Sequence, residues 1–469
     1  MLFPTIEFAV FFAVVFAISW ALNSYNTTKK SFLVLASYFF YAFWKLAYVA
    51  VLFLSSTANY GLALWLGRLR DGPLRRTVFW FAVIANLAVL GVFKYYDFFV
   101  AETMNAMWWM FGIRVNITFL ELGIPVAISF LTFHALSYII DVYNRRIEPT
   151  TSLVDILFYI SFFPHLVAGP IVRARDFLAQ TVHNSRPADI RLGEAALLIL
   201  GGLFKKVIVA NYISTDFVDG VFANPFVYSS LDLLLGMYAY AIQIYCDFSA
   251  YTDIAIGIAC LLGYRFPQNF DQPYRALSVQ DFWRRWHITL SSWLKDYLYI
   301  PLGGNRLGRV RTYVNLMLTM VIGGLWHGAA WHFVLWGTLH GGALAVERLL
   351  GVGHGPRRVP AFVAWLITFH FVCVTWVFFR ADSLESALAY LGNMFGGDHF
   401  GSTTMTWWVA LMLLIGAATQ FWPAHWFDAA AAAYDRASLP VKIAIPFAVI
   451  FIVAVMAPGG IPPFIYFQF

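Results

Sequence analysis

The sequence predicts an all-α polytopic membrane protein with about 11 transmembrane helices plus re-entrant segments. Of its 469 residues, 61% are hydrophobic and only 12% are Asp, Glu, Lys or Arg, whereas about a quarter of a soluble protein is charged. The mean hydropathy is +0.69. This composition excludes a soluble enzyme, a disordered chain and a nucleic-acid-binding domain, and it makes membrane lipid the expected surrounding.

Apolar runs mark the expected helices in order along the chain. They lie at residues 6–22, 31–43, 47–66, 77–98, 119–140, 195–210, 233–260, 313–325, 331–345, 361–379, 407–421 and 443–455. Several are shorter than the roughly 20 residues that cross a bilayer, or contain Pro, Gly or His, as re-entrant segments do. We predict one integral-membrane domain over 1–469, with peripheral N-terminal helices at 1–100, a core at 101–380, and C-terminal helices with a tail at 381–469.

Basic residues orient these helices. The net charge of +6 is small and scattered, so it indicates topology rather than a nucleic-acid partner. The lysine pair at 29–30, the arginines at 68–76 and the pair at 145–146 are separated by two apolar runs each, so they share one side, which the basic excess marks as cytoplasmic. Counting outward predicts that the N-terminus and the tail at 457–469 both lie outside. Because residues 1–10 contain no Lys or Arg, we interpret the first run as a retained helix rather than a signal peptide.

Polar residues interrupt the long apolar run at 233–260. Gln243, Asp247, Ser249 and Asp253 all fall within it. A carboxylate at mid-bilayer costs about 2.5–3.5 kcal/mol, so both aspartates are expected to pair with a cation. The candidate cations are Lys205, Arg284 and Arg285.

The positions of the three cysteines indicate no metal site. Cys246, Cys260 and Cys373 lie far apart inside apolar runs, without the spacing of metal ligands. We expect buried thiols, no metal and no bound cofactor.

Histidines gather in the segment VIGGLWHGAAWHFVLWGTLHGG at 321–342. His327, His332 and His340 are surrounded by apolar residues and glycines. A buried polar group in hydrocarbon faces a cavity or a partner, so each is either a catalytic candidate or a hydrogen bond to a neighbouring helix. On one helix His327 and His332 would diverge by about 140°, which disfavours a local metal pair.

Aromatic and basic residues alternate at 279–306. The aromatic and aliphatic positions that recur at helical spacing are Phe282, Trp286, Leu290, Trp293 and Tyr297. This spacing predicts an amphipathic helix, and we interpret most of the stripe as an anchor at the membrane interface. Arg284, Arg285 and Lys295 lie beside it. They suit a phosphate-bearing donor such as a coenzyme or a carrier pantetheine, although topology explains them equally well.

These two segments resemble the membrane-bound O-acyltransferase (MBOAT) family, and more closely its bacterial AlgI-type polysaccharide O-acetyltransferase branch. The resemblance rests on WRRWHITLSSWL, YIPLGGNR and GGLWHGAAWHFVLWGTLHG, with further stretches at 124–146, 161–177, 201–213 and 245–274. It implies an MBOAT-like fold with a central channel. One departure is His134, where that branch has a glutamine.

The resemblance also implies residue roles. His327 corresponds to the essential membrane-embedded histidine, the base that removes the acceptor hydroxyl's proton, and His287 to a second recurrent polar position that assists it. Tyr466, in the C-terminal PPFIYFQF, resembles a proposed acyl-relay element; alternatively, the aromatic tail only anchors at the interface. Donor binding is assigned to Arg284, Arg285, Trp286, Asn305 and Trp326.

The implied activity is O-acyl transfer, with acetyl as the expected acyl group. The donor would be a cytoplasmic thioester, either acetyl-CoA or a carrier-bound acyl group, and the acceptor an extracytoplasmic polysaccharide such as alginate or cellulose. The implied setting is the bacterial inner membrane, with a periplasmic SGNH-type acetyltransferase or esterase and the polysaccharide synthesis machinery as partners. Two alternatives stay open: a transporter without acyl-transfer chemistry, and the same chemistry on peptidoglycan.

Overall fold

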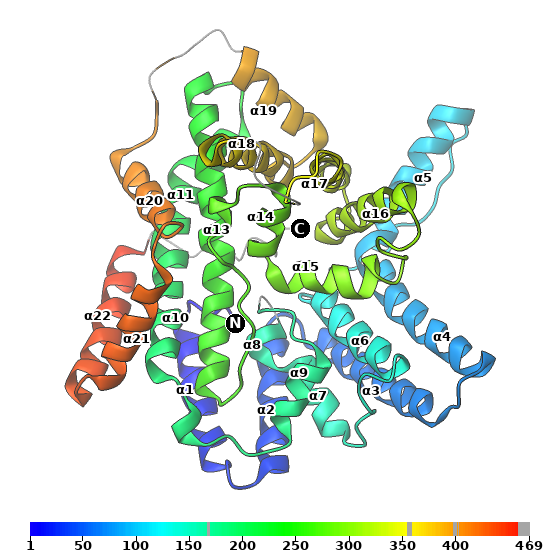
Figure 1. Cartoon of the computed structure of the whole chain (residues 1–469), viewed down its shortest axis with the longest axis vertical. Coiled ribbons are helices and arrows are strands. Elements are labelled where there is room, and N and C mark those ends of the chain that lie inside the picture. Colours follow the sequence, from blue (N-terminus) through cyan, green and yellow to red (C-terminus); the bar gives the residue numbers. More distant parts are fainter. Residues whose placement is uncertain (167–168, 354–358, 397–400, 402, 458–469) are drawn as a thin grey trace. The chain divides into compact units, whose positions relative to one another are not determined.

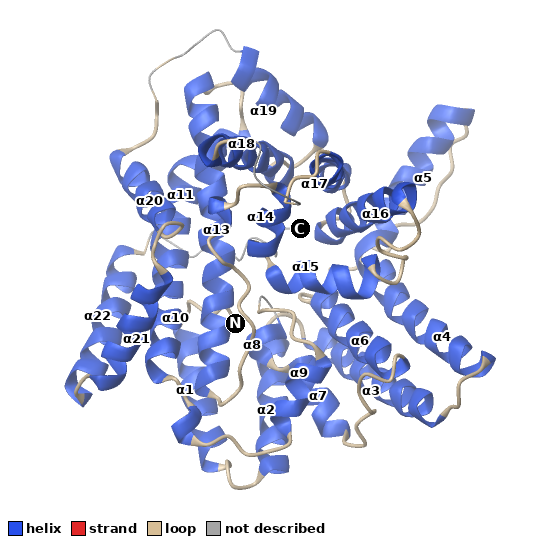
Figure 2. Ribbon diagram, in the orientation of Figure 1, coloured by secondary structure: helices blue, strands red, loops and turns tan. Residues whose placement is uncertain are grey.

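A computed structural model describes residues 1–166, 169–353, 359–396, 401 and 403–457. Every regular element in these residues is a helix, as Figure 2 shows. The described helices form two compact units, residues 1–189 with 262–264 and residues 190–261 with 265–469. The expected limits at residues 100 and 380 stay a prediction.

Unit 1 consists of short and medium-length helices, drawn from blue through cyan to blue-green in Figure 1. They are α1 (Ile6–Ala21), α2 (Asn26–Ala42), α3 (Leu46–Arg68), α4 (Pro73–Leu90), the π-helical segment Gly91–Tyr95, α5 (Tyr96–Phe111), α6 (Ile128–Tyr143), α7 (Leu153–Ser161), α8 (Phe163–Leu166) and α9 (Ala174–Leu178). Local signals explain some starts: Thr5 caps α1 by accepting from the Phe8 N–H, and Pro73 opens α4.

Ion pairs join the basic helix ends of unit 1. Arg145, beyond the end of α6, lies 3.2 Å from Asp71, in the turn between α3 and α4. Arg75 donates to the carbonyl of Tyr143 at the end of α6. Arg145 and Arg75 hold the pKa of the exposed Asp71 carboxyl below its usual range, chiefly through the hydrogen bond from Arg145. The α3–α4 turn and the end of α6 therefore lie side by side, in keeping with the prediction that these two basic clusters share a side.

Unit 2 is built along the long helix α13 (Ser230–Leu261), most of which is buried. Before it come α10 (Leu192–Leu203), the π-helical segment Phe204–Ala210, α11 (Asn211–Ile213), the π-helical segment Ser214–Val218 and α12 (Asp219–Ala223). After it come α14 (Val279–Arg285), α15 (Ile288–Leu294), the π-helical segment Lys295–Tyr299, α16 (Arg309–His327), α17 (Trp331–Leu349), α18 (Ala361–Arg380), α19 (Leu384–Gly396), α20 (Trp407–Ala418), α21 (Ala424–Arg436) and α22 (Leu439–Met456).

Two ion pairs, one partly buried and one buried, connect α13 to the segment that precedes it. Lys205 lies 2.6 Å from Asp253, and Lys206 lies 2.7 Å from Asp247. Both lysines belong to the π-helical segment Phe204–Ala210, whose widened turn lets adjacent residues reach the same neighbouring helix. The expected pairing of Asp253 with Lys205 is confirmed. For Asp247 the expectation was wrong, because its partner is Lys206, which was not among the cations considered.

Five of the described helices are long and apolar enough to cross a membrane by length and composition. They are Leu46–Arg68, Pro73–Phe111, Ser230–Leu261, Ala361–Arg380 and Leu439–Met456, and shorter apolar helices are Ile6–Ala21, Ile128–Tyr143 and Trp407–Ala418. The expected all-α polytopic membrane protein is confirmed.

Candidate active site

His327 ends α16 inside a cage of aromatic rings in unit 2. Its side chain is buried, with 4% of the residue exposed. The rings of Trp326, Trp336 and Phe379 meet it edge-on, with centroids 4.9, 5.1 and 5.1 Å away. The helix ends here because Gly328 takes an extended backbone conformation, and α17 begins at Trp331. The imidazole of His327 therefore lies at the end of a helix and is surrounded by aromatic side chains.

Glycines bring α16 and α17 into backbone contact next to this ring. A Cβ on Gly324 would lie 2.3 Å from the carbonyl oxygen of Phe333, and one on Gly337 would lie 2.3 Å from that of Met320. No side chain fits at either position without moving a helix. The helix that carries His327 is therefore held at a fixed, minimal separation from the helix that carries the cage residue Trp336.

His287 lies at a break in the chain between α14 and α15. Its backbone is left-handed, with φ +43°, and its side chain is completely buried. Its Nδ1 lies 3.1 Å from Oδ1 of Asn269. Its ring contacts Phe248 at 4.7 Å and Trp326 at 6.4 Å, centroid to centroid. Since Trp326 also contacts His327, one indole touches both predicted catalytic imidazoles.

The other two histidines of the predicted segment have defined packing partners. The Trp283 indole N–H donates to Nδ1 of His340 at 3.3 Å, so Nε2 of His340 carries the hydrogen and donates to Oγ1 of Thr375 at 3.0 Å. Nδ1 of His332 lies 2.9 Å from the carbonyl oxygen of Phe378 and donates to it. Both rings hold α17 against its neighbours, which favours the structural interpretation for them.

The aromatic stripe at 279–306 does not form the expected single amphipathic helix. The chain breaks at Trp286 and His287: the extended backbone of Trp286 ends α14, and α15 starts after the left-handed backbone of His287. The stripe residues Phe282, Trp286, Leu290, Trp293 and Tyr297 are all buried. Our interpretation of most of the stripe as an interfacial anchor was therefore wrong: these side chains form the interior of unit 2.

The predicted donor-binding residues occupy different environments. Arg284 is exposed, and Asn305 is exposed in the loop before α16. Arg285 is half-buried and ion-paired, 3.2 Å from Asp271 and 2.9 Å from Asp281. Trp286 and Trp326 are buried, the first with its ring 4.9 Å from that of Trp376. The structure brings Trp326 to the histidines and leaves Arg284 and Asn305 on the surface; their binding roles stay predictions.

Comparison with known proteins decides the family. The family model described as MBOAT, membrane-bound O-acyltransferase family, matches residues 33–387. The chain belongs to the membrane-bound O-acyltransferase family. The resemblance drawn from the histidine and tryptophan motifs is thereby confirmed, and a transporter without acyl-transfer chemistry is the disfavoured alternative.

Relatives of this membrane-bound O-acyltransferase are named for transfer to alginate, peptidoglycan and teichoic acid. It is 42% identical to the probable alginate O-acetylase AlgI of Pseudomonas putida, over 79% of this chain and 76% of the relative. It is 41% identical to the peptidoglycan O-acetyltransferase of Helicobacter pylori, over 78% and 74% of the two chains. It is 29% identical to the teichoic acid D-alanyltransferase of Bacillus subtilis, over 53% and 66%.

Sequence reasoning missed several residues of this acyltransferase site. Asn269, which contacts His287, and the cage residue Trp336 carried no signal beyond being polar or aromatic within matching motifs, and the cage residue Phe379 lies outside those motifs. Tyr466, the predicted relay residue, lies outside the described residues. Within the described part of the chain, no group of three or more His, Cys, Asp and Glu side chains is arranged to hold a metal ion.

Proposed function

We propose that this acyltransferase moves an acetyl group from a cytoplasmic thioester to hydroxyls of an extracytoplasmic polysaccharide, with His327 as the general base. The observation that carries the proposal is the enclosure of His327 by three aromatic rings at the glycine-packed end of α16. A base that is shielded from bulk water suits transfer to a chosen hydroxyl, because water would otherwise hydrolyse the thioester.

In the proposed reaction, an imidazole nitrogen of His327 takes the proton of the acceptor hydroxyl as the hydroxyl oxygen bonds to the thioester carbonyl carbon. The tetrahedral intermediate then collapses, the C–S bond breaks, and the leaving sulfur takes the proton back from the imidazolium. The products are an ester and a free thiol, and His327 is regenerated. A positioned base of this kind contributes about 10²–10⁴ in rate.

His287, whose ring contacts the same Trp326 indole as that of His327, assists this step. The surface residues Arg284 and Asn305 bind the polar part of the donor, where a guanidinium suits a coenzyme phosphate or a carrier phosphopantetheine. Arg285 contributes by holding its own segment through Asp271 and Asp281. The donor is acetyl-CoA or a carrier-bound acetyl group.

Tyr466 is the proposed relay for the acetyl group. In the proposed reaction, the hydroxyl that attacks the thioester is the phenol of Tyr466; it gives up its proton to His327 and then carries an aryl ester that is more reactive than an alkyl ester. A serine hydroxyl of a periplasmic SGNH-type partner or a sugar hydroxyl then bonds to the acetyl carbon, the aryl C–O bond breaks, and the phenol oxygen takes up the proton of that hydroxyl. The sequence supports this step because Tyr466 is the single hydroxyl among the aromatics of the tail PPFIYFQF.

The proposed setting is the bacterial inner membrane, with both termini outside and with the polysaccharide synthesis machinery as the supplier of the acceptor. Alginate is the acceptor we favour, because the named relatives at 40–42% identity include several probable alginate O-acetylases. Cellulose stays a candidate from the sequence resemblance alone. Peptidoglycan is the second candidate, favoured by the relative of Helicobacter pylori at 41% identity.

The experiment uses purified protein in lipid nanodiscs and acetyl thioesters labelled in the acetyl group. We expect thiol release and transfer of the label to protein or polysaccharide, with acetyl-CoA and acetylated carrier protein compared as donors. The His327→Ala variant is the control for base-dependent chemistry. An intact thioester with wild-type protein and every donor would contradict the proposal. Acetyl analysis of alginate, cellulose and peptidoglycan from cells with and without the protein identifies the acceptor.

A further inference from the structure

Asn269 makes a set of contacts that defines the chemistry of His287. The asparagine is 1% exposed and precedes α14 in unit 2. Its Oδ1 lies 3.2 Å from the backbone nitrogen of Thr289, 2.9 Å from Oγ1 of Thr289 and 3.1 Å from Nδ1 of His287. Its backbone carbonyl accepts from the N–H of Ile288 at 3.0 Å. Asn269 therefore holds the start of α15 and the imidazole before it with one side chain and one carbonyl.

These contacts determine which atom carries the hydrogen. A backbone N–H only donates, so the amide atom that faces Thr289 is the oxygen and not the nitrogen. An amide oxygen only accepts, so Nδ1 of His287 is the donor in the contact between them. A neutral imidazole carries one hydrogen, and therefore Nε2 of His287 presents a lone pair.

The lone pair of Nε2 lies in a buried, largely aromatic environment. Nε2 of His287 has no hydrogen-bond partner among the described residues, and the ring is packed against Phe248 and Trp326. Leaving a buried acceptor unsatisfied costs about 1–3 kcal/mol. A position that keeps such an acceptor next to the indole that also touches His327 is suited to a ligand that donates a hydrogen bond there.

We propose that Asn269 is the positioning residue that fixes His287 as the Nδ1–H tautomer, so that His287 acts toward substrate as a hydrogen-bond acceptor. Its ligand is then an O–H or N–H group, such as the acceptor hydroxyl or an amide of a pantetheine arm, and not the oxyanion of the tetrahedral intermediate, which needs a donor. This inference rests on the proposed function, because it assigns His287 a part in acyl transfer.

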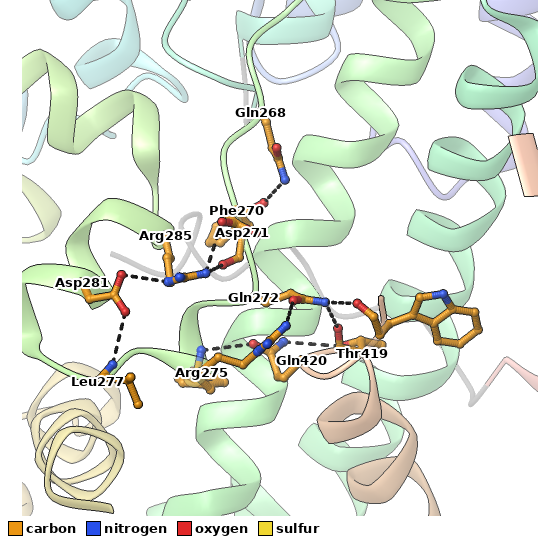
Figure 3. A network of polar contacts seen from close by, with 12 residues as sticks. Gln268, Phe270, Asp271, Gln272, Arg275, Leu277, Asp281, Arg285, Thr419 and Gln420 are labelled. Carbon is orange, nitrogen blue, oxygen red and sulfur yellow. Dashed lines mark hydrogen bonds and ion pairs between the residues drawn. The ribbon is translucent and has the colours of Figure 1, made fainter. Parts of the chain in front are cut away.

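The segment that carries Asn269 is braced, as Figure 3 shows for the residues that follow it. The Asp271 N–H donates to the carbonyl of Arg285 at 2.9 Å, and the Arg285 guanidinium lies 3.2 Å from the Asp271 carboxylate. Gln272 donates to the carbonyl of Trp422, and the N–H of Tyr274 donates to Oε1 of the buried Gln420 at 3.1 Å. The asparagine thus lies in a segment that is hydrogen-bonded both to α14 and to the residues that follow α20.

The test combines a spectroscopic measurement with turnover. In protein labelled with ¹⁵N-histidine, and with the His287 signals assigned by their loss in His287→Gln, we expect wild-type His287 to show a protonated Nδ1 and an unprotonated Nε2. Asn269→Leu should lose this preference and lower kcat by about 10- to 100-fold, the magnitude seen when the residue that orients a metal-bound histidine is removed. Asn269→Asp keeps the acceptor oxygen, so it should retain the tautomer and recover most of the turnover.

Asn315→Leu is the matched control, because Asn315 is an equally buried asparagine of unit 2 that instead donates to the carbonyl of Gly304. It should leave the tautomer of His287 unchanged. In Asn269→Asp the new carboxylate stabilises the imidazolium, so the acid limb of the pH–rate profile should move to higher pH. A structural role alone would not shift that limb.

A wild-type spectrum with a protonated Nε2 would overturn the inference, and so would an Asn269→Leu variant with unchanged tautomer and turnover. If Asn269→Leu does not fold, the wild-type spectrum and Asn269→Asp decide the matter. A His287→Gln variant with full activity would instead reject the proposed part of His287 in acyl transfer, and it would do so without any change at Asn269.

Discussion

At the scale of single residues, replacing His327 should lower activity, whereas replacing His340 should lower stability. His327→Ala removes the proposed base from its aromatic cage, so acyl transfer should fall by at least about 10²-fold while the protein inserts and folds normally. His340→Ala removes both hydrogen bonds, to Trp283 and to Thr375, and should cost about 1–3 kcal/mol of stability. Turnover per folded molecule and the thermal midpoint of each purified variant measure the two effects. A His327→Ala protein with more than about a tenth of wild-type turnover would reject the base assignment.

Arg284 tests the binding of the donor. Because Arg284 is exposed whereas Arg285 is ion-paired to Asp271 and Asp281, Arg284→Glu changes the surface charge without breaking that network. We expect the apparent KM for an anionic thioester to rise several-fold, kcat to change little, and the effect to shrink as salt is added. Arg70→Glu, an equal charge change at an exposed position in unit 1, is the control. Equal KM values for the two variants would leave Arg284 with a role in topology only.

At the scale of helices, α16 and α17 pack so closely that only glycine fits at Gly324 and Gly337. A Cβ at Gly337 would meet the carbonyl oxygen of Met320 at 2.3 Å, whereas one at Gly342, in the same helix, meets nothing within 4 Å. Gly337→Ala should therefore destabilise the protein by about 1–3 kcal/mol through overpacking. Gly342→Ala should be neutral or stabilising by about 0.5–1 kcal/mol.

Thermal unfolding and turnover of these two alanine variants measure the consequence for the site. Gly337→Ala should also lose activity, because separating the helices moves His327 relative to Trp336. Equal stability and turnover in Gly337→Ala and Gly342→Ala would contradict a fixed helix separation.

Helix starts were more predictable from the sequence than the break within the active site. Ser278 precedes α14 and its hydroxyl accepts from the Asp281 N–H, which is a recognisable cap. By contrast, the helical spacing of the aromatic residues runs uninterrupted through His287, and left-handed backbone is uncommon for residues other than glycine. Contacts of Asn269 with His287, Ile288 and Thr289 accompany that conformation, and helical spacing does not encode them. His327 was found by its motif, but its cage residue Phe379 comes from α18 and depends on tertiary packing.

For the whole molecule, the positive-inside count predicts which side each loop faces. In a variant whose three cysteines are replaced by alanine, Asn116→Cys should react with a membrane-impermeant thiol reagent added outside. Gly72→Cys, in the exposed turn between α3 and α4, should react only after permeabilisation. A Cβ at Gly72 meets nothing within 4 Å, so this substitution does not disturb packing. The reverse labelling pattern would invert the proposed topology.

The C-terminal relay is tested in the intact protein. Tyr466→Phe keeps the aromatic ring and removes only the hydroxyl, so we expect normal insertion and loss of polysaccharide acetylation. In wild-type protein incubated with labelled donor, mass spectrometry of the C-terminal peptide should show an acetylated Tyr466. Full acetylation of the polysaccharide in the Tyr466→Phe variant would instead support an anchoring tail.

Composition alone was enough to predict a helical membrane protein. With only 12% charged and 61% hydrophobic residues, the chain has too few charges to cover the surface of a soluble protein. The division into two units near residue 189 was not anticipated, since the apolar runs continue on both sides of it. Which cation neutralises Asp247 was also not predictable, because adjacent Lys205 and Lys206 both reach α13 only through a π-helical turn.

These neighbouring ion pairs have a consequence for biogenesis. If α13 and the segment before it entered the bilayer separately, α13 would carry two aspartates into hydrocarbon and the earlier segment would carry two lysines. Each charge would cost about 2.5–3.5 kcal/mol. Pairing Lys205 with Asp253 and Lys206 with Asp247 removes most of that cost only once both helices are together. The translocation machinery would therefore have to retain the earlier segment until α13 emerges from the ribosome, and release the two as one helical hairpin.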